Sequence, residues 1–208
     1  METYKLYENN PNSRILQDIA RVIRDGGIII YPTDSVYAIG CDALNQRAVE
    51  KIYQYRKEDA KTGHLSIICK DISQADEYTK ISKEQYKLMH RHLPGPFTFI
   101  LETGLKLPKV FRSRKTVGIR VPNNKILHAL LEELDGPILT TSLKVPVVEE
   151  EEIDPGYMTD PFLIEETFRH QADILIDGGY GQEQPSTVVD LTGDAPEIVR
   201  QGVGELEL

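Results

Sequence analysis

The 208-residue sequence has no tryptophan, only two cysteines, and no apolar run of the roughly 18 residues needed to cross a bilayer. Cys41 and Cys69 form no CxxC pair, so we expect buried free thiols rather than metal ligands. The first residues lack the basic start and apolar core of a signal peptide. Neither GxGxxG nor GxxxxGK[ST] occurs, and no zinc spacing is present. These absences predict a cytoplasmic protein with neither standard nucleotide loop.

Charge is distributed unevenly along the chain, whose formal net charge is −9. Between Lys83 and Lys125 there are ten Lys/Arg and two glutamates, whereas from Val145 onward sixteen acidic residues accompany two arginines. A basic central third can bind polyphosphate or RNA. An ordinary solvated face would give the same count, so composition alone leaves both interpretations open.

The stretch from Gly26 to Gly40 reads GGIIIYPTDSVYAIG. Its apolar run between glycine and proline predicts a short strand that is buried on both faces. Thr33, Asp34 and Ser35 follow the strand at once, where α/β proteins commonly place ligand contacts. The same residue types also form ordinary turns, which is the structural alternative.

Helical and strand patterns alternate along most of the chain. Ser13 is the expected N-cap of the first helix and Asn45 that of the second. Further helices are expected at residues 73–78, 82–92, 125–134 and 164–170, with strands at 65–69, 116–122 and 137–142 and one after the PGP turn. Three closely spaced strands near the end (DILIDGG, STVVDLTG and EIVRQG) are expected to be antiparallel neighbours. The pattern predicts an α/β domain with a mixed sheet.

Several motifs occur in a recognisable order. PTDSVYAIG is followed by PGPFT, GIRVP, TTSLKVP, PSTVVD and IVRQG. Together they resemble the YrdC/YciO family of threonylcarbamoyl-AMP synthase-like proteins, and TTSLKVP is most similar to the YciO branch. The resemblance covers about residues 12–204. It implies one YrdC-like domain over residues 1–208, with a twisted mixed β-sheet flanked by helices and a concave cleft on one side.

The resemblance also implies a site, although it assigns no catalytic residue and no metal ligand. Thr33, Tyr37 and Arg120 would bind threonine. The nucleotide would be bound by Arg56, Lys57, Thr98, Ser142, Lys144, Ser186, Thr187 and Arg200. Apart from the family, Arg120 lies between apolar strand residues and therefore needs a fixed anionic partner. That partner is either an internal carboxylate or the carboxylate of a ligand.

The implied reaction joins L-threonine, bicarbonate and ATP into threonylcarbamoyl-AMP, with magnesium, for the threonylcarbamoyladenosine modification of tRNA. Two positions depart from the family's pattern, since Glu58 replaces the arginine of a Lys-x-Arg pair and Lys144 replaces the asparagine of Ser-x-Asn. Both departures predict weakened activity. At Glu58 the reason is that a triphosphate needs concentrated positive charge. The alternative is a double-stranded RNA- or tRNA-binding module with a degenerate nucleotide site, whose basic residues from Lys83 to Lys125 form one positive surface.

Overall fold

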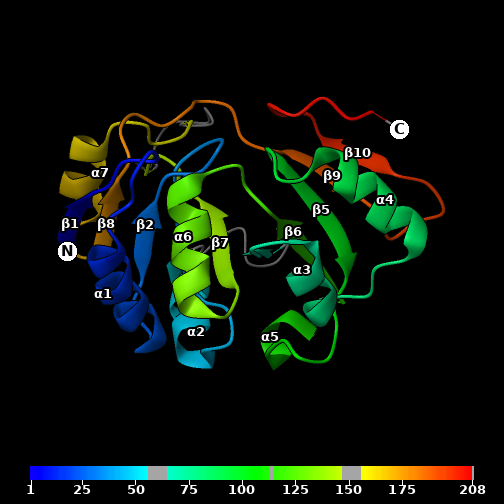
Figure 1. Cartoon of the computed structure of the whole chain (residues 1–208), viewed down its shortest axis with the longest axis horizontal. Coiled ribbons are helices and arrows are strands. Elements are labelled where there is room, and N and C mark those ends of the chain that lie inside the picture. The colour runs from blue at the N-terminus through cyan, green and yellow to red at the C-terminus, as the bar shows by residue number, and fades with distance from the viewer. Residues whose placement is uncertain (56–64, 113–114, 147–155, 208) are drawn as a thin grey trace.

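The computed structural model describes residues 1–55, 65–112, 115–146 and 156–207, apart from the side chains of Val110 and Arg112. Its strands form one ten-stranded sheet in the order β1-β8-β2-β3-β7-β4-β6-β5-β9-β10 (Figure 1). The strands are β1 (Glu2–Lys5), β2 (Ile29–Tyr31), β3 (Ala38–Asp42), β4 (Ser66–Ile68), β5 (Phe97–Glu102), β6 (Thr116–Arg120), β7 (Ile138–Ser142), β8 (Ile174–Asp177), β9 (Thr187–Asp190) and β10 (Glu197–Arg200). The helices are α1 (Ser13–Arg24), α2 (Gln46–Tyr55), α3 (Ile72–Tyr78), α4 (Lys83–His92), α5 (Lys109–Arg112), α6 (Lys125–Leu134) and α7 (Pro161–Phe168).

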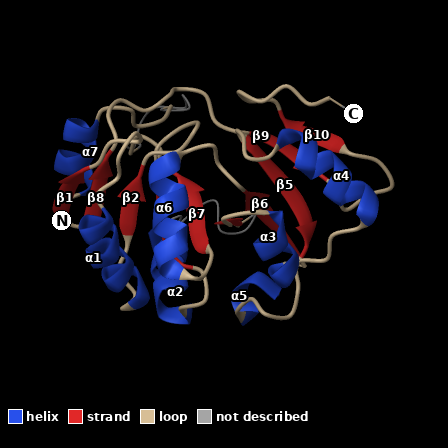
Figure 2. Cartoon of the chain, in the orientation of Figure 1, coloured by secondary structure: helices blue, strands red, loops and turns tan. Residues whose placement is uncertain are grey.

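Strand pairing confirms the predicted mixed sheet. Parallel pairs join β1 to β8, β2 to β8, β4 to β6 and β5 to β9, and the other neighbours are antiparallel. The prediction of three consecutive antiparallel neighbours is wrong for β8, which lies between β1 and β2 at the far end of the sheet. Of the three strands in this prediction, only β9 and β10 pair as antiparallel neighbours. Short spacing suggested a hairpin, but the segment after β8 instead crosses the top of the sheet to reach β9 (Figure 2).

Local capping mostly follows the sequence signals. Asn45 accepts a hydrogen bond from the Ala48 amide, as expected of an N-cap. The cap of α1 is Asn12 rather than Ser13, because its side-chain oxygen accepts from the amides of Arg14 and Ile15. The sequence patterns predicted neither β1 nor α5. The free cysteines Cys41 and Cys69 are both buried, as predicted.

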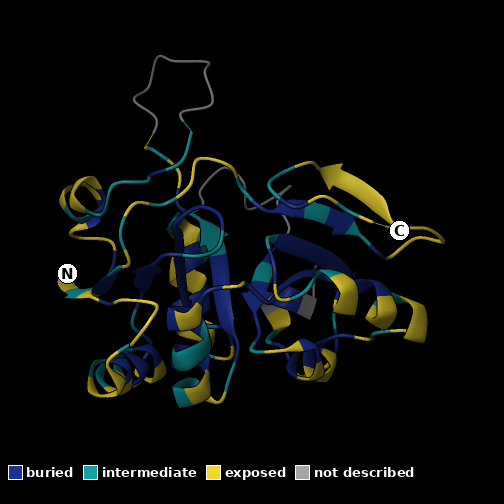
Figure 3. Cartoon of the chain, turned by 45° about the horizontal axis from the view of Figure 1, so that its top comes forward, coloured by how far each residue is buried: buried dark blue, intermediate teal, exposed yellow. Residues whose placement is uncertain are grey.

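The two faces of the sheet are covered differently. Helices α2, α3, α4 and α7 contribute to a hydrophobic cluster that includes residues from β2 through β9. On the opposite face, α1 and α6 pack together, and their apolar residues form a second cluster with side chains of β2, β3, β7, β8 and one residue of β4 (Figure 1). Inner helix faces are therefore buried, whereas their outer faces are exposed (Figure 3). No helix in the described ranges is long and apolar enough to span a membrane.

Candidate functional site

A pocket of about 270 Å³ opens where the cover formed by α1 and α6 ends. Its lining comes from strands β4, β5, β6, β7, β9 and β10 and from the residue before β9. The lining residues are Ser66, Thr98, Ile100, Arg120, Thr140, Thr141, Ser142, Ser186, Val188, Val199 and Arg200. Hydroxyl groups and two arginines therefore dominate a hollow whose volume is near the lower end of small-molecule sites.

Strand register explains why hydroxyls gather there. Gly118 pairs with Ser66 on one neighbouring strand and with Ile100 on the other. A Cβ atom at Gly118 would lie 2.4 Å from the Ser66 hydroxyl and 2.8 Å from the Thr98 methyl group. Because contacts under 3.0 Å require a shift, glycine leaves room for these two side chains, both of which line the pocket.

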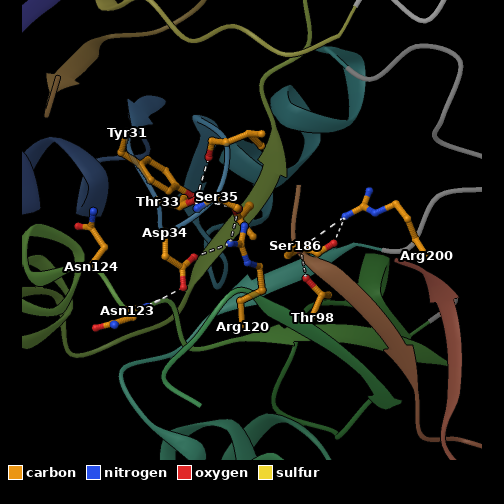
Figure 4. A network of polar contacts seen from close by, with 12 residues as sticks. Tyr31, Thr33, Asp34, Ser35, Thr98, Arg120, Asn123, Asn124, Ser186 and Arg200 are labelled. Atoms are coloured by element: carbon orange, nitrogen blue, oxygen red, sulfur yellow. Dashed lines mark hydrogen bonds and ion pairs between the residues drawn. The ribbon is translucent and has the colours of Figure 1, made fainter. Parts of the chain in front are cut away.

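Arg120 is the buried charge of the pocket, with 4% of its surface exposed. Its Nη2 donates to Asp34 Oδ1 at 3.2 Å and to Ser35 Oγ at 3.1 Å (Figure 4). Burial lowers the pKa of Arg120, and the charge of Asp34 opposes that shift. Guanidinium remains charged even so. Its Nε is buried and has no hydrogen-bond partner among the described residues.

The turn after β2 is built largely by its own side chains. Thr33 Oγ1 donates to the Val36 carbonyl at 2.8 Å and accepts from the Ser35 amide at 3.0 Å. It also lies 3.1 Å from Ser35 Oγ, which contacts Arg120. Thr33 and Arg120 are therefore connected through Ser35, but Thr33 is not among the described lining residues of the pocket. The Thr33 hydroxyl donates its proton to the Val36 carbonyl within the turn.

The opposite wall centres on Ser186. Its hydroxyl lies 2.9 Å from Thr98 Oγ1, and Arg200 Nη2 donates to its carbonyl at 2.8 Å (Figure 4). Thr187 makes its side-chain contacts with the C-terminal segment instead. Its Oγ1 donates to the Gly204 carbonyl and accepts from the Gly202 amide. Ser186 and Arg200 thus line the pocket, whereas Thr187 anchors the C-terminal segment behind it.

Tyr37 also makes a structural contact. Its hydroxyl donates to the Gly179 carbonyl at 2.7 Å and accepts from the Gly178 amide at 3.2 Å. Gly181 packs on the Tyr37 ring so closely that a Cβ there would lie 2.6 Å from it. Burial raises the pKa of Tyr37, so its phenol stays protonated. Tyr37 fixes the segment that crosses from β8, and it is not among the described lining residues.

Arg56 and Lys57, which were expected to bind the nucleotide, lie outside the described residues, as does Glu58, which departs from the family's pattern. Ser142 lines the pocket, as expected. Lys144 is exposed, and its backbone forms an isolated antiparallel β-bridge with Tyr157. Its side chain is not among the described lining residues.

Sequence reasoning named neither Ser66 nor Thr140 as a lining residue, nor Asp34 as the partner of Arg120. The Tyr31 hydroxyl donates to Thr140 Oγ1 at 2.8 Å, so Thr140 connects the pocket to the helix-covered core. Alternation along PILTTS, with Ile138 and Thr140 on one face, could have indicated a strand that is half covered and half open. Nothing local marks Ser66, because its role depends on pairing with Gly118.

The arrangement suits binding of a small anion. A buried arginine and several hydroxyls can orient a carboxylate or phosphate. The described residues contain no group of three or more His, Cys, Asp or Glu that could hold a metal ion.

Comparisons with known proteins agree with this architecture. A family model for Sua5/YciO/YrdC, described as telomere recombination, matches residues 21–202. The chain belongs to the Sua5/YciO/YrdC family. Among its relatives is YciO of Escherichia coli (strain K12), described as uncharacterized, with 38% identity over 98% of this chain and 97% of that protein.

Solved structures and a further relative extend the comparison. The crystal structure of E. coli YciO superposes with a TM-score of 0.90 at 37% identity, covering 100% of this chain and 98% of that one. P. abyssi Sua5 complexed with L-threonine gives 0.86 at 28% identity, covering 97% of this chain and 58% of that one. A putative threonylcarbamoyl-AMP synthase of Methanocaldococcus jannaschii is 29% identical over 96% of this chain and 92% of its own length. These findings confirm the predicted YrdC-like fold.

Proposed function

We propose that this protein is a threonylcarbamoyl-AMP synthase-like enzyme that binds L-threonine in the pocket around Arg120. The observation that carries the proposal is a buried guanidinium that lines the pocket and has more N–H donors than its bonds to Asp34 and Ser35 use. A substrate carboxylate would accept hydrogen bonds from the remaining donors on the pocket side. Support also comes from the relative named a threonylcarbamoyl-AMP synthase and from the related Sua5 structure that contains L-threonine.

The reaction would proceed in two chemical stages. Threonine's amine adds to bicarbonate with loss of water and forms a carbamate. A carbamate oxygen then attacks the α-phosphorus of ATP, and pyrophosphate leaves. Arg200 and the Ser186 hydroxyl, which line the wall opposite Arg120, would contact the nucleotide phosphates and stabilise the charge on their oxygens. Magnesium enters this proposal with the phosphates of ATP, to which it commonly binds while keeping several waters.

The direct test measures pyrophosphate release that depends on both L-threonine and bicarbonate. We expect weak turnover in the wild type, because losing one cation that acts on transition-state charge typically costs on the order of 10²–10³ in rate. The double variant Glu58→Arg with Lys144→Asn restores the family's pattern and should raise turnover rather than merely tighten ATP binding. Silence of both proteins would contradict the proposal.

RNA binding is the second candidate function, and the exposed face of α4 favours it. Lys83, Lys87 and Arg91 follow one another at four-residue intervals and are all exposed, so they share one side of the helix. The expected surface is smaller than the sequence count suggests, because Arg120 is buried and Lys106 pairs with Glu77 at 2.9 Å. RNA affinity should fall steeply with salt, and affinity indifferent to salt would contradict this candidate.

A further inference from the structure

The partner of Arg120 is a carboxylate that lies behind it rather than in the pocket. Asp34 Oδ1 is 3.2 Å from Arg120 Nη2, and both side chains are buried, with 8% and 5% of their surface exposed. The second oxygen, Oδ2, accepts the Asn123 amide at 2.8 Å (Figure 4). Two contacts therefore fix the carboxylate. Asp34 is not among the described residues that line the pocket, whereas Arg120 is.

Asp34 does not accept all the hydrogen bonds that the Arg120 guanidinium can donate. Nη2 donates to Asp34 and Ser35, and Nε has no hydrogen-bond partner in the described part of the chain. Guanidinium offers five N–H donors, and a buried donor without an acceptor is costly. A second anion can therefore join Arg120 from the pocket, but it does so beside a negative charge that is already there.

We propose that Asp34 is a specificity-determining residue that acts through Arg120 and reserves it for a ligand group with a single negative charge. Each negative charge of a ligand at Arg120 is attracted by the guanidinium and repelled by Asp34. A dianion meets that repulsion twice, and burial keeps the repulsion from being screened as it is in water. Asp34 therefore lowers the affinity for a phosphate dianion more than it lowers the affinity for a carboxylate.

This selection has a use if the proposed function holds, and in that respect the inference rests on it. An enzyme that binds both an amino acid and ATP must keep phosphates out of the carboxylate position. Arg200 lines the opposite wall, and the structure describes no carboxylate bound to its guanidinium. Asp34 thus makes the two arginines unequal, with Arg120 suited to the carboxylate and Arg200 to the phosphates.

The test compares two sulfur oxyanions of similar shape, methanesulfonate with one negative charge and sulfate with two. Their affinities are measured by calorimetry for the wild-type protein and for Asp34→Asn, which can still accept the Asn123 amide. Removal of the Asp34 charge should tighten binding by on the order of tenfold per ligand charge. We therefore expect the affinity of sulfate relative to methanesulfonate to rise about tenfold in the variant.

Two further variants separate charge from positioning. Asp18→Asn is the matched control, because Asp18 lies at the same 3.2 Å from Arg21 but on the exposed face of α1, and it should change neither affinity. Ser35→Ala removes a hydrogen bond to Arg120 without changing the charge. It should alter both affinities by the same factor and leave their ratio unchanged.

An unchanged sulfate-to-methanesulfonate ratio in Asp34→Asn would overturn the proposal. Should that variant fail to fold, Asp34→Glu takes its place: it retains the charge, so the wild-type ratio must persist, and a raised ratio would overturn the proposal. L-Threonine is titrated in parallel. If the ratio shifts while L-threonine neither binds nor supports pyrophosphate release, the proposed function fails and the role of Asp34 in charge selection stands.

Discussion

One face of the sheet is divided into two halves of opposite character. Under α1 and α6, side chains such as Ile138 and Ile68 are apolar and buried. Thr140 lies two residues after Ile138 on β7, and Ser66 lies two residues before Ile68 on β4. Both Thr140 and Ser66 line the pocket. The same strands therefore serve a hydrophobic core at one end and a polar hollow at the other.

The division shows that helix coverage, rather than strand identity, decides which positions can serve a ligand. Where α6 presents Leu127 and Leu130, only apolar side chains can pack without leaving buried polar groups unpaired. Where no helix lies over the strands, hydroxyls and Arg120 bond to one another or to a ligand. The buried Asp34–Arg120 pair stands at the edge of that open half.

The largest effect is expected from replacing Arg120, the buried arginine of the open half. Arg120→Gln leaves Asp34 buried without its ion-pair partner, which should lower the free energy of unfolding by about 3–5 kcal/mol. Pyrophosphate release should fall on the order of 10²–10³ if the proposed function holds. Urea denaturation measures the first effect. Arg21→Gln is the control, because its exposed pair with Asp18 should contribute about 0–1 kcal/mol. Equal losses in the two variants would contradict the comparison.

A truncation in the covered half should affect stability alone. Leu130 is fully buried on α6, and Leu130→Ala should cost about 2–5 kcal/mol through lost burial and the cavity left behind. Affinity for L-threonine, measured below the unfolding transition, should stay within about twofold, since additivity holds for separated sites. A large loss of affinity would show that the two halves are coupled.

The fold was predictable largely because its signals are local. The apolar run before Pro32 and the cap at Asn45 lie within a few residues of the elements they define. The position of β8 was not predictable, because it depends on pairing with β1 and β2 over more than a hundred residues. The site followed the same rule. Arg120 was identifiable from its apolar neighbours, whereas Asp34 as its partner required the distance between β6 and the turn after β2.

The bond between Tyr31 and Thr140 joins the two halves, and breaking it should have a moderate effect. Thr140→Val leaves the buried Tyr31 hydroxyl without its acceptor, which should cost about 1–3 kcal/mol. The double variant with Tyr31→Phe removes both polar groups and should recover part of that loss. Denaturation of Thr140→Val, Tyr31→Phe and the double variant completes the cycle. A double variant as unstable as the sum of the single changes would contradict a direct interaction.

The smallest effect concerns alkaline pH and the hydrophobic cluster to which α2, α3, α4 and α7 contribute. Burial raises the pKa of the Cys41 and Cys69 thiols, both of which belong to that core. In the unfolded chain the pKa of a thiol is about 8.5. Above that pH the folded state binds more protons than the unfolded state, so stability falls as pH rises. Below pH of about 8 the contribution is fully present. Between pH 7.5 and 9.0, roughly 1 kcal/mol or less per thiol should be lost. Denaturation under reducing conditions measures this loss. Cys69→Ala should reduce the pH dependence of stability by the contribution of one thiol. An unchanged pH dependence in that variant would show that groups other than Cys69 cause it.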